Sequence, residues 1–309
     1  MTKVACIGEC MIELKQAEGD LFSRGYGGDT LNTSVYLARL GVAVDYISAL
    51  GDDSLSDEMI AGWIEEGVGT SRVARLKGKL PGIYMIQTDD LGDRRFFHWR
   101  ESAAARSLMD LPETDGMLDS LGTYDVVYLS AITLSIYSAQ GRTKLIGALR
   151  RARKHGARIV FDTNFRASGW PDPDVARAVF DEAFAASDIV LAATEDLLPL
   201  YPDESDAQLM ERIRCNETVL KLLRPASIVR FEDVSKEVRA EPVTQPVVDT
   251  TAAGDSFSAA YIAARLAGAE PVEAARAGHR LGGAVVCYPG AIIPRSAMPP
   301  DILPGAASQ

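Results

Sequence analysis

The sequence contains few of the residue types that build disulfide frameworks and metal sites. Four cysteines occur among 309 residues, and no two of them have the C-x-x-C spacing of a redox or zinc motif. Histidine is rarer still, with three residues. This composition predicts reduced, mostly buried thiols and argues against a histidine-rich metal site. The cysteines are Cys6, Cys10, Cys215 and Cys287.

Long apolar runs are absent as well. No stretch of 18 apolar residues is present, and the apolar segment at the start of the chain is too short for a secretory signal. No Pro/Gly-rich linker, low-complexity tract or internal repeat divides the chain. Its 47% hydrophobic content allows a substantial core, and an α/β enzyme can use this length as one unit. We therefore expect a cytoplasmic protein without a membrane partner, in which residues 1–309 form a single domain.

Two common phosphate-binding motifs are missing. The sequence has no G-x-x-x-x-G-K-[ST] string, which excludes a P-loop kinase as far as motifs allow. The glycines at residues 8 and 25–28 do not form G-x-G-x-x-G after a predicted strand, which argues against a Rossmann dehydrogenase.

Positive charge is in deficit. The chain has 32 Lys and Arg residues against 43 Asp and Glu residues, which gives a net charge of −11. This balance argues against non-specific nucleic-acid binding. The densest basic run, at residues 150–155, ends a predicted helix, where cations interact favourably with the helix dipole. We interpret it as a solvated helix end.

Apolar segments of strand length alternate with helical patterns along the chain. This alternation predicts an α/β fold with a mostly parallel sheet covered by helices on both faces, and ligands at the carboxyl ends of the strands. The expected strands are residues 3–9, 44–49, 125–130, 158–162, 188–192 and 218–222. The expected helices are residues 29–40, 54–66, 138–155, 173–185, 254–267 and 271–287.

One region departs from this rhythm. Residues 82–87 and 94–100 predict two short strands around a β-hairpin turn at residues 88–93. Together with residues of about 10–26 they can form a small extra sheet, or they can extend the main sheet. The sequence leaves both arrangements open.

The segment at residues 247–257, V-V-D-T-T-A-A-G-D-S-F, predicts a short strand, a turn of small residues and a helix that begins near Gly254. Small side chains let backbone N–H groups point outward at the positive end of a helix, which makes an anion site. Asp255 lies in the first turn of that helix. By itself it is equally an N-terminal cap or a catalytic carboxylate.

A second glycine-containing turn precedes a helix at residues 26–33, Y-G-G-D-T-L-N-T. The glycine pair allows a ligand to approach the backbone closely. Asp29 and Asn32 then offer polar side chains from the first helical turn. A tight turn with an N-cap explains the same residues without a ligand.

Several of these strings resemble the ribokinase-like sugar kinases. D-T-T-A-A-G-D at residues 249–255 is similar to that family's D-T-x-G-A-G-D, with Ala252 in place of the first glycine. G-G-D-T-L-N-T at 27–33, F-F-H-W-R at 96–100 and F-D-T-N-F-R at 161–166 resemble the subgroup that acts on 2-keto-3-deoxygluconate. The resemblance covers nearly the whole chain. It implies a ribokinase-like fold with a small β lid, built from about 10–26 and 80–102, over the sugar.

The resemblance also implies roles for particular residues. Asp255 is expected to be the catalytic base. The expected anion hole is Ala252, Ala253 and Gly254. The expected substrate-binding residues are Gly28, Asn32, Tyr84, Arg100, Arg166 and Asp255. The expected nucleotide-binding residues are Asn164, Arg166, Lys221, Ala252 and Gly254. The arginines suit a sugar acid, because a guanidinium recognises a carboxylate with two hydrogen bonds.

The expected reaction is the ATP-dependent phosphorylation of 2-keto-3-deoxygluconate to its 6-phosphate. Mg²⁺ is implied as a cofactor, with Glu195 as an indirect ligand, although the asparagine of the family's N-x-x-E is absent. A monovalent cation such as K⁺ is implied near Asp249. A homo-oligomer formed through the lid is implied as well.

The nucleotide end departs from the family's pattern. Leu223 stands where the family has the glycine of K-x-G, and leucine does not adopt a positive φ cheaply. We therefore expect an altered turn at residues 221–235 and weakened or changed nucleotide binding. Two other functions stay open: a kinase for a neutral sugar such as fructose or ribose, and a sugar-acid-binding protein without kinase activity.

Overall fold

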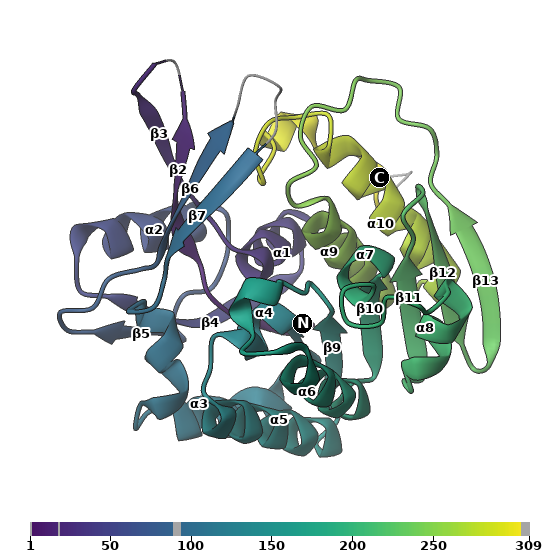
Figure 1. Ribbon diagram of the computed structural model, residues 1–309, viewed down its shortest axis with the longest axis horizontal. Helices are drawn as coiled ribbons and strands as arrows, with labels where there is room; N and C mark the ends of the chain where they lie inside the picture. Colours follow the sequence, from purple (N-terminus) through teal and green to yellow (C-terminus); the bar gives the residue numbers. More distant parts are fainter. Residues whose placement is uncertain (1, 18, 89–93, 304–309) are drawn as a thin grey trace.

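The computed structural model describes residues 2–17, 19–88 and 94–303. A nine-stranded sheet in the order β13-β12-β11-β10-β9-β8-β1-β4-β5 forms the centre of the molecule (Figure 1). Neighbouring strands from β11 to β5 are parallel, and β12 and β13 are antiparallel additions at one edge. The predicted mostly parallel sheet is therefore confirmed. The strands are β1 (Lys3–Ile7), β4 (Ala43–Gly51), β5 (Val73–Leu76), β8 (Val126–Ser130), β9 (Arg158–Asp162), β10 (Ile189–Ala193), β11 (Glu217–Lys221), β12 (Ala226–Phe231) and β13 (Val234–Arg239).

Helices cover both faces of this sheet, and each face has its own apolar core. In β1, Ala5 and Ile7 join one core while Val4 and Cys6 join the other, because successive side chains of a strand point to opposite faces. One core is completed by α3 (Thr114–Asp119), α5 (Ala139–Lys154), α6 (Pro173–Ala186) and α8 (Asp206–Arg212). The other is completed by α1 (Asp29–Arg39), α2 (Ser54–Glu65), α9 (Ala253–Leu266) and α10 (Pro271–Val285).

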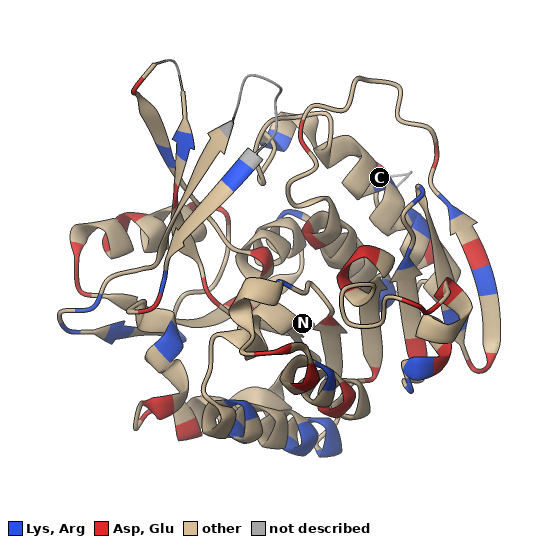
Figure 2. Ribbon diagram, in the orientation of Figure 1, with Lys and Arg blue, Asp and Glu red and all other residues tan. Residues whose placement is uncertain are grey.

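Short polar residues fix where the helices begin. Asp53 accepts the backbone N–H groups of Leu55 and Ser56 at the start of α2, and Asp172 does the same for Val175 at the start of α6. The basic run at 150–155 lies at the end of α5, as predicted, and its arginines pair with carboxylates of neighbouring elements. In Figure 2 this group of basic residues lies at the lower edge of the molecule. Two short helices, α4 (Ala131–Ser135) and α7 (Thr194–Leu197), follow β8 and β10 directly.

A second, four-stranded sheet has the order β3-β2-β6-β7 and stands apart at the upper left of Figure 1. We call it the small sheet. Strand β2 pairs antiparallel with β3 and parallel with β6, and β6 pairs antiparallel with β7. The predicted hairpin strands therefore belong to a separate sheet, while residues 89–93 of the predicted turn lie outside the described residues. The strands are β2 (Met11–Gln16), β3 (Phe22–Gly27), β6 (Ile83–Thr88) and β7 (Arg94–Trp99).

The strand predicted at the start of residues 247–257 is wrong. Val247 and Val248 lie in an irregular loop and are 60% and 53% exposed. The amides of Val248 and Asp249 donate to the Val286 carbonyl, which is 2.8 and 3.1 Å away, rather than to a neighbouring strand. No helix among the described residues combines the length and apolar character that a membrane span requires.

Candidate active site

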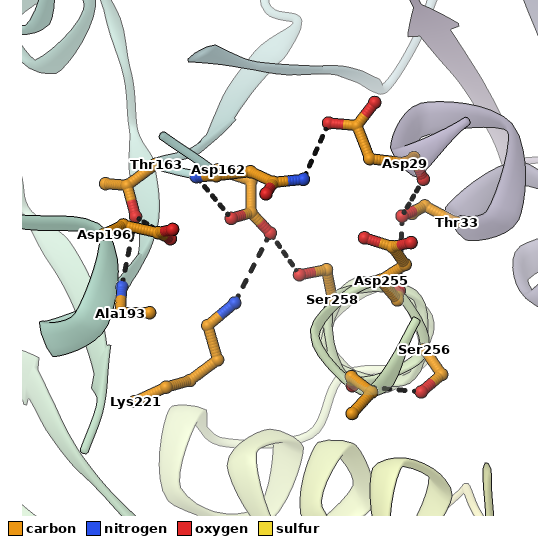
Figure 3. A network of polar contacts seen from close by, with 12 residues as sticks. Asp29, Thr33, Asp162, Thr163, Ala193, Asp196, Lys221, Asp255, Ser256 and Ser258 are labelled. Carbon is orange, nitrogen blue, oxygen red and sulfur yellow. Dashed lines mark hydrogen bonds and ion pairs between the residues drawn. The ribbon is translucent and has the colours of Figure 1, made fainter. Parts of the chain in front are cut away.

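Charged side chains from four elements meet at the carboxyl edge of the parallel strands. Asp162 ends β9 and Lys221 ends β11, while Asp29 and Asp255 lie in the first turns of α1 and α9 (Figure 3). This is the edge at which α/β sheets bind ligands, because the helices that follow the strands begin there. These side chains thus converge at the carboxyl ends of the strands, where the sequence predicted a ligand site.

Asp255 is held by a residue from the other end of the sequence. Its Oδ2 accepts the Nδ2 amide of Asn32, with a distance of 2.8 Å. Burial, followed by repulsion from the Asp29 carboxylate, raises the pKa of Asp255 to about 8. A carboxyl group with such a pKa can accept a proton near neutral pH, as a general base must.

Asp29 forms the second carboxylate of this group. It accepts the Nδ2 amide of Asn164 at 2.9 Å, and burial raises its pKa. The Thr33 hydroxyl lies 3.1 Å from the Asp29 carbonyl oxygen and 3.2 Å from that of Asp255, and so ties α1 to α9. Figure 3 shows Asp29 and Asp255 on either side of this threonine.

Asp162 is the most connected member of this group that lies on a strand of the main sheet, and it is 3% exposed. Its Oδ2 accepts the Ser258 hydroxyl at 2.6 Å and lies 3.5 Å from the Lys221 ammonium. The same ammonium lies beside Gly254, since a Cβ built on that glycine would be 3.5 Å from Lys221 Nζ. Asp162 therefore holds a cation next to the first turn of α9.

The two acidic residues after β10, Glu195 and Asp196, differ in exposure. Glu195 is exposed, whereas Asp196 is buried and accepts the Thr163 hydroxyl at 3.0 Å. Burial raises the pKa of Asp196 to about 6, and Lys221 and Arg166 oppose that rise. Arg166 lies 3.2 Å from Asp196, but its side chain is 59% exposed and open to a ligand.

The turn that leads into α9 has an unusual backbone. Ala252 has φ of 59° and ψ of 15°, a left-handed conformation that costs a residue with a Cβ about 1 kcal/mol. The Ala253 amide donates to the Thr250 carbonyl at 3.3 Å. The amides of Gly254 and Asp255 belong to the first helical turn, whose N–H groups have no intrahelical acceptor. They face the site from the positive end of α9.

The glycine pair at residues 27–28 is required for packing. A Cβ on Gly28 would lie 2.2 Å from the Glu9 carbonyl, and one on Gly27 would lie 2.4 Å from the Tyr84 hydroxyl. Tyr84 in turn donates to Glu13, with an oxygen–oxygen distance of 2.5 Å. The small sheet therefore sits directly against the start of α1.

Arg100 is paired with a residue that the sequence did not single out. One Nη of Arg100 contacts Glu9, just past the end of β1. The Glu9 side chain is 1% exposed, and burial raises its pKa although Arg100 opposes the rise. The Nε of Arg100 and the Oδ1 of Asn32 are both buried without a hydrogen-bond partner among the described residues.

The turn after Lys221, which we expected on the nucleotide side, does not have a glycine-type backbone at Leu223. Leu223 is 72% exposed, and the residues with positive φ in the described chain, apart from glycines, are Glu232, Asp233 and Ala252. The φ of Leu223 is therefore not positive, and its backbone conformation does not require glycine. Lys221, two residues earlier, is the part of this segment that reaches the charged group.

The structure adds residues to those predicted from the sequence. Asp162 lies inside the quoted F-D-T-N-F-R string and Asp196 follows Glu195, so neighbouring motifs could have pointed to both. Glu9 is the last residue of a predicted strand, which is a weaker signal. No sequence motif pointed to Ser258, because its role depends on a hydrogen bond to Asp162, which is 96 positions away.

The two sheets and the charged group at their junction define a ribokinase-like α/β protein. A fructokinase with bound ATP from Xylella fastidiosa has the same fold, with a TM-score of 0.82 and 23% identity over 96% of this chain and 95% of that one. The chain belongs to the pfkB family of carbohydrate kinases, whose model matches residues 1–298.

Relatives within this family extend over nearly the full chain. The 2-dehydro-3-deoxygluconokinase of Dickeya dadantii is 41% identical over 305 residues, which is 96% of this chain and 98% of the relative. The enzyme of the same name from Escherichia coli K12 is 39% identical over 306 residues, covering 96% and 99%.

Proposed function

We propose that the protein transfers the γ-phosphoryl group of ATP to the C6 hydroxyl of 2-keto-3-deoxygluconate, also called 2-dehydro-3-deoxygluconate. The observation that carries the proposal is the position of Asp255, a carboxylate with raised pKa at the first turn of α9 and beside Asn32. The names of the relatives with 39–41% identity support this substrate.

Asp255 acts as the general base. Its Oδ accepts the proton of the C6 hydroxyl as the hydroxyl oxygen attacks the γ-phosphorus in line. The bond between that phosphorus and the β–γ bridging oxygen breaks, and ADP leaves with the electron pair. Asn32 donates to one carboxylate oxygen and so orients the other towards the substrate.

The surrounding charges stabilise the transferred group. The amides of Gly254 and Asp255, together with the dipole of α9, favour an anion at the start of the helix. Lys221 adds a full positive charge beside Gly254, and Asp162 fixes its position. Such prepositioned charges provide most of the catalysis in phosphoryl transfer.

Two arginines favour a sugar acid over a neutral sugar. Arg100 is fixed by Glu9 with part of its guanidinium free, and Arg166 is exposed beside the site. A substrate carboxylate can pair with such groups, whereas fructose or ribose offers them no charge. Gly28 and Tyr84 contact the sugar in this proposal.

Mg²⁺ fits the acidic residues on the nucleotide side. This ion keeps several waters and binds one or two carboxylates together with substrate phosphates. Asp162 and Asp196 are buried carboxylates near Lys221, while Glu195 would act through water from the surface. When bound, the ion neutralises phosphate charge. Among the described residues no cluster of three or more acidic, His or Cys side chains forms a preformed cage.

The small sheet has the character of a subunit interface. Large apolar side chains on it are exposed, and clusters of such residues mark interaction surfaces. We propose that it pairs with the same sheet of a second copy while it covers the sugar. These exposed residues are Phe22, Phe96, Phe97 and Trp99, together with Leu21 directly before β3.

A coupled assay of ADP release tests the function. We expect rapid turnover with ATP, Mg²⁺ and 2-keto-3-deoxygluconate, little with fructose or ribose, and a kcat about 10³-fold lower with Asp255→Asn. Turnover on a neutral sugar alone would overturn the substrate. Binding of the keto acid without ADP release from any sugar would instead support a sugar-acid-binding protein.

A further inference from the structure

One face of α9 contacts both Lys221 and the carboxylate that holds this lysine. Gly254, Phe257 and Ser258 have the spacing i, i+3 and i+4, which places them on the same face of the helix. The Lys221 ammonium lies 5.8 Å from the centroid of the Phe257 ring, and a Cβ built on Gly254 would lie 3.5 Å from it. The Ser258 hydroxyl donates to Asp162, the counterion of that ammonium. The helix that carries the proposed base therefore also locates this lysine.

A single oxygen atom of Asp162 contacts three elements. Its Oδ2 accepts the Ser258 hydroxyl of α9 at 2.6 Å and the Tyr128 hydroxyl of β8 at 3.3 Å, and it lies 3.5 Å from the ammonium of Lys221 on β11. Figure 3 shows Ser258 and Lys221 approaching this oxygen from different sides. Both hydroxyls are buried, and hydrogen bonds to an ionised acceptor are roughly twice as strong as bonds between neutral groups. The two hydroxyls therefore fix the oxygen that faces Lys221.

Lys221 requires such support, because a lysine ammonium is a point charge on a flexible stem. Its side chain is 17% exposed and would lose rotamer freedom in any single position. Asp162 selects the position beside Gly254. Ser258 lies one helical turn after Gly254, so its hydrogen bond ties this position to the same helix that presents the first-turn amides.

We propose that Ser258 is a positioning residue for phosphoryl transfer: through Asp162 it sets the distance between the Lys221 ammonium and the first turn of α9. Tyr128 supports the same carboxylate from β8. The inference rests on the proposed kinase function. It adds that a neutral, buried hydroxyl, which contacts neither substrate, controls the placement of a positive charge at the transferred phosphoryl group.

A purely structural role of Ser258 would have different consequences. The same helix carries Asp255, which Asn32 holds on the proposed sugar side. A helix loosened by the loss of Ser258 would therefore raise KM for both substrates. A role that acts through Lys221 changes kcat and KM for ATP and leaves KM for the keto acid unchanged.

The first test measures steady-state kinetics with ATP, Mg²⁺ and 2-keto-3-deoxygluconate. For Ser258→Ala we expect kcat to fall about tenfold, less than for loss of a direct transition-state donor. KM for ATP should rise about threefold, while KM for the keto acid stays within about twofold of wild type. Tyr128→Phe should show the same pattern more weakly, because its hydrogen bond is longer.

Ser187→Ala is the matched control. It removes another buried hydroxyl, one that donates to the Ala183 carbonyl at 2.7 Å at the end of α6, and it should match wild type in all three kinetic parameters. All variants are assayed below their Tm, so that unfolding does not contribute. Equal rises in the two KM values would overturn the inference, as would Ser258→Ala kinetics that match those of Ser187→Ala.

A double-mutant cycle with Lys221→Met tests whether Ser258 acts through the lysine. In the Lys221→Met background, Ser258→Ala should lower kcat by less than about twofold, because the group that it positions is already absent. An effect of Ser258 on a metal ion at Asp162 would persist without the lysine. Additive losses in the cycle would therefore overturn the inference.

Calorimetric binding of a non-hydrolysable ATP analogue separates this inference from the proposed function. Ser258→Ala should weaken binding about threefold, and it should have no effect in the Lys221→Met background. Wild type that shows this pattern but releases no ADP with the keto acid would overturn the proposed function and support the inference. Normal turnover of the keto acid, together with analogue binding that Ser258→Ala leaves unchanged, would overturn the inference and support the function.

Discussion

The proposed sugar side and the proposed nucleotide side of the site differ in how completely the protein builds them. On the sugar side, Asn32 holds Asp255 and Glu9 holds Arg100, and all these contacts are wholly or largely buried. On the nucleotide side, Leu223 is 72% exposed and Arg166 is 59% exposed. The difference indicates that sugar recognition is set before the ligand arrives, while the nucleotide completes its own site.

The largest expected effect comes from the base. Asp255→Asn keeps the size of the side chain but cannot accept the hydroxyl proton, so we expect kcat to fall about 10³-fold. Binding of the keto acid, measured by calorimetry, should change little, because Asn32 and the arginines remain. A variant with near wild-type kcat would show that the base lies elsewhere.

The ion pair of Glu9 and Arg100, on the proposed sugar side, comes next. Glu9→Gln leaves the Arg100 guanidinium without its buried counterion, which should cost roughly 3 kcal/mol of unfolding free energy. KM for the keto acid should rise about tenfold, because the guanidinium loses its fixed orientation.

Glu101→Gln is the matched control for this change. Its pair with Arg106 is 3.8 Å long and the Glu101 side chain is 92% exposed, so the loss should stay below about 1 kcal/mol. Equal losses of unfolding free energy for the two substitutions, measured by chemical denaturation, would contradict a sugar side that is ordered before the ligand binds.

The raised pKa of Asp255 predicts a pH dependence of both activity and stability. Because the base must be ionised, kcat/KM should rise with pH through about 8. The folded state also holds this proton more tightly than the unfolded state, where the pKa is near 3.8. The stabilisation that protonated Asp255 provides is therefore complete below pH 3.8 and is lost as pH rises through about 8.

Asp255→Asn removes this titration and should be more stable than wild type at pH above about 8, with the difference shrinking towards acidic pH. Thermal unfolding across that range measures it. A wild-type kcat/KM that is flat through the same range would contradict the assigned pKa.

The smallest effect is expected on the nucleotide side. Leu223→Gly removes an exposed side chain and admits a positive φ, so KM for ATP should fall about threefold without a change in KM for the sugar. Leu80→Gly, at another exposed leucine, serves as the control. A rise in KM for ATP would show that Leu223 itself contacts the nucleotide.

Much of the fold could be predicted because buried strands and amphipathic helices leave clear periodic patterns. Strands β12 and β13 were not predicted, since Val234–Arg239 mixes charged and apolar residues at an exposed sheet edge. The false strand at residues 247–248 shows the opposite limit. Two extended valines look like a strand, but a strand also requires a neighbour, which the sequence does not display.

The candidate site likewise contains residues that local sequence motifs predicted and contacts that they did not. Local strings pointed to Asp255 and Asn32, and the structure brings these two together across 223 positions. The contacts of Arg100 with Glu9 and of Asp249 with Lys15 could not be predicted, because each joins the small sheet to the rest of the molecule, and the sequence does not specify how those two parts are placed. Contacts between the small sheet and the rest of the molecule therefore required the structure.

The most direct test of the central claim is the ³¹P NMR spectrum of the product formed from ATP and 2-keto-3-deoxygluconate. The account predicts a phosphomonoester signal coupled to the protons on C6, because Asp255 activates that hydroxyl. An uncoupled inorganic phosphate signal would mean ATP hydrolysis, and coupling to protons on another carbon would mean a different acceptor. Either result would contradict the account.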